Sequence, residues 1–142
     1  MKKMIITTIL LISLLAVGCA GLGSSPSDTV ENFVSEFDQG NYDTCYQMMS
    51  SGYRQETGLA DFVSLSRDVN PEKYEFIEVT EEYVDGDTAV VNVLVNESSV
   101  AVKFSLKDFF EVEEEHEEVV KQIELIKQED EWKFTEFPYA LT

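Results

Sequence analysis

The segment "EVEEEHEEVV", residues 111 to 120, is the densest group of side chains that could bind a metal ion. His116 with neighbouring carboxylates could bind zinc, and the carboxylates alone could bind calcium. Zinc sites usually need several His or Cys ligands, and the chain has one His. In an extended strand His116 shares a face only with alternate glutamates such as Glu114 and Glu118. We therefore expect no metal centre, and we interpret the run as a solvated edge or loop whose charges prevent pairing between molecules.

Two other sets of residues could bind a metal ion or act in catalysis. "DGDTA", residues 85 to 89, contains alternating acidic residues, but a calcium loop places its glycine sixth, whereas Gly86 is second here. We interpret it as a hairpin turn. Asp61 and Tyr46 could serve as acid or base inside a cavity, yet no His–Asp pair, phosphate loop or dinucleotide fingerprint accompanies them. We therefore expect a protein that is not an enzyme, with no cofactor and no catalytic residue.

Seven aromatic side chains fall on faces expected to point inward, and they could line a pocket for an apolar ligand. Aromatic residues more often fill a core, which is the reading that we favour. The seven are Phe33, Phe37, Tyr46, Phe62, Tyr74, Phe104 and Trp132.

The first residues predict an export signal. Lys2 and Lys3 precede an apolar stretch over residues 4–17, which is too short for a comfortable membrane span. The end of this stretch, "LAVGC", resembles the lipobox of prokaryotic lipoproteins, although Ala16 stands where that motif usually has Leu. The resemblance implies cleavage between Gly18 and Cys19, and a diacylglycerol on the sulfur of Cys19. The alternative is a plain signal peptide with an incidental cysteine.

This reading divides the chain into three parts. Residues 1–18 are the lipoprotein signal peptide, residues 19–25 are the lipidated cysteine with a flexible tether, and residues 26–142 are a single domain. A lipidated Cys19 would hold the domain on the extracytoplasmic side of the cell membrane, because several acyl chains together bind firmly. Cys45 then has no partner for an internal disulfide, and we expect it to pack as a small apolar residue.

The charge of the chain limits its partners. The formal net charge is −18, which argues against binding nucleic acid and against electrostatic adhesion to anionic lipid. The lipid would therefore be the only contact with the membrane. Adaptation to salty surroundings is an alternative reason for the acidity. Asn96 begins a glycosylation sequon, which would matter only in a cell with that machinery.

The hydrophobic pattern predicts three helices followed by about five strands. Ser25, Pro26 and Asp28 form a capping signal for a helix that ends at Gly40. Shorter helices are expected from Tyr42 to Met49 and from Leu59 to Arg67, the latter with Phe62 and Leu65 inward. Strands are predicted over residues 74–84, 88–96, 100–106 and 119–128, and around 132–134, with turns at 85–86, 96–99 and 129–130. This order indicates an α+β domain with an antiparallel sheet.

The segments "SPSDTVENFVSEFDQGNYDTCYQMMS", "DGDTAVVNV" and "EDEWKF" resemble small lipoproteins of the nuclear transport factor 2-like superfamily. The resemblance implies N-terminal helices packed in a curved sheet that forms a cone with a cavity. Many members are extracytoplasmic domains without assigned activity, some bind small molecules, and a few are isomerases or dehydratases. It also implies that a homodimer is feasible.

We therefore expect a membrane-anchored extracytoplasmic lipoprotein whose domain binds a small apolar ligand or an envelope protein. The alternative function is a cavity enzyme of the isomerase or dehydratase type, which would need an ionisable residue inside the pocket. A third hypothesis makes the acidic surface a weak calcium or metal buffer.

Overall fold

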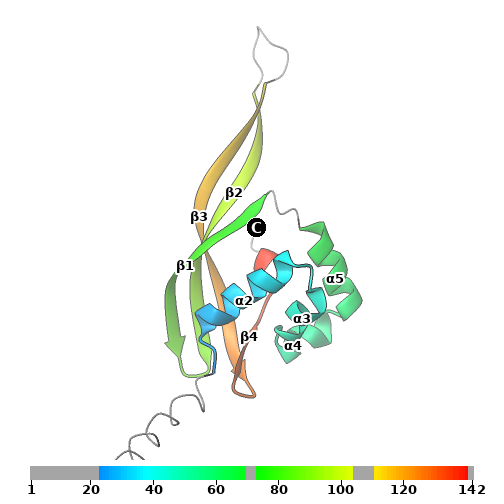
Figure 1. Cartoon of the computed structure of the whole chain (residues 1–142), viewed down its shortest axis with the longest axis vertical. Coiled ribbons are helices and arrows are strands. Elements are labelled where there is room, and N and C mark those ends of the chain that lie inside the picture. The colour runs from blue at the N-terminus through cyan, green and yellow to red at the C-terminus, as the bar shows by residue number, and fades with distance from the viewer. Residues whose placement is uncertain (1–22, 70–72, 104–110, 141–142) are drawn as a thin grey trace, which may run out of the picture.

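Among the described residues, four helices precede four strands (Figure 1), as the α+β prediction requires. The computed structural model describes residues 23–69, 73–103 and 111–140. The helices are α2 (Pro26–Asp38), α3 (Tyr42–Gln47), α4 (Ser51–Glu56) and α5 (Leu59–Asp68). The strands are β1 (Tyr74–Asp85), β2 (Thr88–Lys103), β3 (Glu111–Gln128) and β4 (Glu131–Phe134), followed by a 3-10 turn, η1 (Pro138–Ala140).

The strands form one antiparallel meander in the order β1-β2-β3-β4. β2 pairs with β3 along its whole length, from Thr88 with Ile126 to Lys103 with Glu111. β1 reaches only as far as Glu97 on β2, and β4 covers only the last residues of β3. β2 and β3 therefore continue beyond the sheet as a two-stranded arm, residues 98–103 and 111–116 (Figure 1).

This pairing corrects two of the predicted strands. The expected turn at residues 96–99 is wrong, because β2 runs without interruption through it. Residues 88–96 and the start of the predicted strand 100–106 therefore belong to one strand, and the sheet has four strands rather than five among the described residues. Asn, Glu and Ser favour turns locally, but here their backbone lies opposite residues 115–118 of β3. Ladder pairing outweighs a weak local preference.

The helix ends follow the capping chemistry of the sequence. Ser25 Oγ accepts a hydrogen bond from the Asp28 backbone N–H at 3.0 Å, and the Asp28 carboxylate accepts one from the Ser25 backbone N–H, also at 3.0 Å. Gly40 takes a φ of 76° just after α2, a conformation that glycine adopts at little cost. The prediction missed α4, which begins after the cap Ser50 and has no buried residue, so no apolar period reveals it.

The core lies between the helices and one face of the sheet. The predicted inward positions of the central strands are buried, among them Val91 and Val93 on β2 and Leu125 on β3. Leu65, which we expected to face inward, is 48% exposed, whereas Ser66 is buried. The inward stripe of α5 therefore runs from Phe62 to Ser66, four positions later, and Leu65 lies beside this stripe.

Candidate functional site

Most of the seven aromatic side chains that the sequence placed on inward faces fill the core. The rings form a continuous cluster, with centroids 4.7 Å apart for Phe33 and Phe134 and 5.4 Å apart for Phe62 and Phe137. Phe33, Phe37, Phe62 and Trp132 are buried, Tyr46 and Tyr74 are partly buried, and Phe104 lies outside the described residues. Of the six that are described, Tyr74 lines an apolar pocket.

An apolar pocket of about 40 Å³ remains between the sheet and the segments that cover it. Its floor comes from alternate residues on three strands, and its opposite wall comes from α2 and η1. The floor residues are Tyr74, Phe76, Val93, Val95, Lys121 and Ile123, and the wall residues are Val34, Pro138 and Tyr139. We call this space the η1 pocket. It is much smaller than the roughly 300–1,000 Å³ of a pocket for a drug-sized ligand.

Tyr139 is the wall residue that the sequence analysis missed. Its ring lies 4.5 Å from that of Phe37 and 5.9 Å from that of Phe137, centroid to centroid. Burial, and secondly the nearby charge of Asp38, raise the pKa of its phenol well above the usual range. The signal available in the sequence was the aromatic tail "FPYA" after the last strand.

Lys121 is the cationic residue of the η1 pocket. It lies opposite Val93 in the β2–β3 register, and its ammonium Nζ is 2.7 Å from Oε1 of Glu97. The two side chains are 23% and 29% exposed, so the ion pair is partly screened by water. Glu97, on β2, lies directly opposite Glu117 of β3 on one side and Tyr74 of β1 on the other. Glu97 is not a lining residue of the pocket, but it lies beside the end that Tyr74 and Lys121 line, at the base of the arm, and we call this end the pocket mouth.

The two catalytic candidates lie away from this pocket. Tyr46 donates its hydroxyl to the backbone carbonyls of Arg54 and Thr57, at 3.2 and 3.0 Å. Asp61 is exposed in the first turn of α5. Neither lines the η1 pocket, whose ionisable groups are Lys121 and two tyrosine hydroxyls.

Cys45 packs in the core, as expected. Its side chain is fully buried, and Sγ lies 3.7 Å from the carbonyl oxygen of Phe33, to which the thiol donates. Burial, followed by the charge of Glu36, raises the pKa of the thiol to about 12. The thiol is therefore protonated and shielded at neutral pH, and a nucleophilic role does not suit it.

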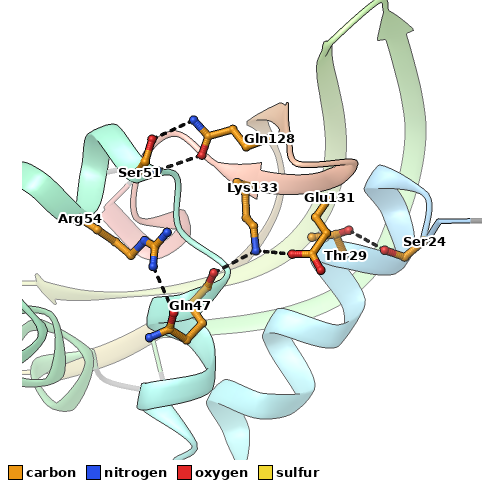
Figure 2. A network of polar contacts seen from close by, with 8 residues as sticks. All are labelled: Ser24, Thr29, Gln47, Ser51, Arg54, Gln128, Glu131 and Lys133. Carbon is orange, nitrogen blue, oxygen red and sulfur yellow. Dashed lines mark hydrogen bonds and ion pairs between the residues drawn. The ribbon is translucent and has the colours of Figure 1, made fainter.

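A polar network joins the short helices to the β3–β4 hairpin (Figure 2). Gln128 accepts from the backbone N–H of Ser51 at 2.9 Å and donates to its hydroxyl at 3.0 Å. Lys133 donates to the Gln47 carbonyl at 3.1 Å and pairs with Glu131 at 2.6 Å, while Arg54 donates to the Gln47 side chain at 3.1 Å. Arg54 Nε has no hydrogen-bond partner among the described residues, and the other groups satisfy one another. We therefore interpret the network as one that fixes the short helices to the hairpin.

The acidic run lies on β3 rather than in a loop. Residues 115–118 are exposed, and the side of β3 that faces away from β2 has no strand partner between 111 and 124 among the described residues. In the part of the chain that the structure describes, no three His, Cys, Asp or Glu side chains are close enough to hold a metal ion. Asn96 of the sequon is partly buried in mid-sheet, between Glu75 of β1 and Glu118 of β3.

The predicted anchor falls outside the described residues. This applies to the signal peptide, residues 1–18, and to Gly18 and Cys19 at its cleavage point. Among the helices that the structure describes, none is long and apolar enough to cross a membrane.

No protein-family model and no curated protein matches this sequence. The fold is similar to the solution structure of RPA3114, a SEC-C motif containing protein from Rhodopseudomonas palustris. The TM-score is 0.51 at 14% identity, over 79% of this chain and 76% of that one. A candidate dehydratase of the NTF2-like family from Streptomyces avermitilis aligns at a TM-score of 0.44 and 18% identity, over 78% of this chain and 93% of that one. The first similarity shows a shared fold, and the second is too loose to carry an argument.

Proposed function

We propose that this chain is an extracytoplasmic lipoprotein whose nuclear transport factor 2-like cone domain binds a small apolar ligand without turning it over. Cys19 would carry the lipid, and the η1 pocket would hold the ligand. The single observation that carries the binding role is the lining of that pocket, which is apolar apart from Lys121 and the two tyrosine hydroxyls.

Residues 1–19 support the anchor. Two lysines, a short apolar stretch and Gly18-Cys19 follow the order of a lipoprotein signal. The test is expression of the full chain in a bacterial host fed labelled palmitate, with Cys19→Ser as the matched control. We expect palmitate label in the native chain and none in the variant. A native chain that takes up no label would overturn the anchor.

The shape of the η1 pocket supports ligand binding with one movable wall. The floor strands and α2 are held by ladder and helix hydrogen bonds. The rest of the wall is η1, a three-residue turn whose Tyr139 ring contacts Phe33 and Phe37. A ligand of more than a few heavy atoms therefore enters only if Tyr139 moves aside.

Native mass spectrometry of the chain purified gently from its own host tests the binding role. We expect a reproducible non-covalent adduct, whose mass identifies the ligand. Val95→Phe, which puts a ring into the pocket, should abolish the adduct, whereas Val120→Phe on the exposed opposite face should keep it. A bare mass for the native chain would refute ligand binding and would favour an envelope protein as the partner.

A further inference from the structure

We propose that the η1 pocket selects a small primary alkylammonium ligand, with its alkyl chain on Val95 and its ammonium at the Glu97 carboxylate. This inference rests on the proposed function, because it names the ligand class of the same pocket.

The side chain of Lys121 shows which kind of group binds at the pocket mouth, namely an alkyl chain that ends in an ammonium. Lys121 and Glu97 share the pocket face of the sheet, and the pair Val95–Val119 lies between them in the register. Their side chains must therefore lean toward each other across this apolar pair to bring Nζ within 2.7 Å of Oε1. An alkyl stem on an apolar floor with an ammonium on Glu97 is the arrangement that a free alkylammonium would reproduce.

The charge at the mouth is unbalanced in favour of a cation. Glu97 and Glu117 lie directly opposite each other on the same face, an arrangement that is unfavourable for like charges. Lys121 supplies one ammonium for these two carboxylates, and Glu117 has no ion pair within the described ranges. One added monocation would balance the group, whereas a carboxylate ligand would add a third negative charge.

The volume of the pocket sets the size of the alkyl group. An apolar cavity of about 150 Å³ holds benzene, and the η1 pocket has about 40 Å³. The space therefore admits the end of a short chain when Tyr139 is in place. A four-carbon amine is the matching probe.

The test compares n-butylammonium, butan-1-ol and butyrate, which share a chain and differ in charge. The matured full chain is held in neutral phosphatidylcholine nanodiscs, with methyl groups labelled for NMR. Shifts of the Val95 and Ile123 methyls report the η1 pocket, and the exposed Val120 methyls report unspecific binding. We expect n-butylammonium to bind about two- to five-fold more tightly than butan-1-ol, as a partly exposed ion pair allows, and butyrate to bind most weakly.

Two variants tie the preference to the ion pair. The ammonium preference is the affinity for n-butylammonium divided by the affinity for butan-1-ol. Glu97→Gln should reduce this ratio to about one. Lys121→Met should increase it, because the variant loses the competing ammonium of Lys121 and keeps an apolar side chain of similar length. A merely structural ion pair would leave the ratio of the two affinities unchanged in both variants. That ratio is independent of any general loss of stability.

The outcomes separate the inference from the proposed function. If no probe shifts the pocket methyls, or if Val120 responds equally, the ammonium inference and ligand binding at the η1 pocket both fail, whereas the anchor at Cys19 is tested separately. If butan-1-ol binds as tightly as n-butylammonium, or butyrate binds best, ligand binding stands and the ammonium inference is overturned.

Discussion

Removal of the Tyr139 ring should turn the η1 pocket into a site for benzene. The pocket has about 40 Å³, and a cavity of about 150 Å³ holds benzene. About 110 Å³ more is therefore needed, and the phenol ring that Tyr139→Ala removes is about the size of a benzene molecule. Tyr139→Ala should therefore create the space, with Phe37 and Val34 as part of its wall.

The cost of this change follows from the same volume. At about 24 cal/mol per Å³ of residual cavity, about 110 Å³ corresponds to roughly 2.6 kcal/mol of unfolding free energy. Tyr139 is only partly buried, so we treat this as an upper bound and expect about 1–2.5 kcal/mol. In a domain of this size, such a loss lowers Tm by roughly 4–10 °C.

Thermal unfolding by circular dichroism, with and without benzene, is the assay. Benzene at ten times its dissociation constant should return about 1.4 kcal/mol to Tyr139→Ala and little to the native chain. Tyr83→Ala removes an equal ring from an exposed position and is the matched control, with no gain from benzene. Equal stabilisation of native chain and variant by benzene would refute the assignment of η1 as the wall of the pocket.

Three further predictions concern stability. Because burial raises the pKa of Cys45 to about 12, the unfolded chain loses the thiol proton first. The stability that this group contributes is therefore present below about pH 8.5 and is lost as pH rises toward 12, by up to about 1.4 kcal/mol per pH unit. Urea unfolding at pH 8 and pH 10 should show that the free energy of unfolding falls less between these two values in Cys45→Ala than in the native chain. Ser25→Ala removes half of the capping box and should cost about 1 kcal/mol in the same measurement, while an unchanged midpoint would mean that the cap is idle. Glu129 and Asp130 have φ of 52° and 65°, so Glu129→Asn with Asp130→Gly should raise stability by about 0.5–1 kcal/mol, and a loss would contradict the turn assignment.

Elements that depend on neighbours in the chain were predicted well. The capping box at Ser25, the stop at Gly40 and the turn at Glu129–Asp130 all involve residues within four positions of one another. The alternation of Val91 and Val93 likewise identified the core face of β2. Such signals are local, and the local energy terms act in the same direction as the fold.

Elements that depend on distant pairing were not predicted. Continuous pairing with β3 removed the expected turn at residues 96–99, and α4 lacks the apolar period that would have revealed it. The core role favoured for most of the aromatic side chains agrees with their burial, but the sequence did not indicate that Phe134 and Phe137, from the end of the chain, are the rings they pack against.

The sequence alone determined the α+β class, the order of helices before strands and the strongly acidic character, and it predicts the lipid anchor at Cys19. Only the tertiary structure decided where a ligand could bind. The η1 pocket combines Val34, Lys121 and Tyr139, residues from three segments that are far apart along the chain. No local pattern marks such a set, because its members share a surface only after the sheet has paired and η1 has packed against α2.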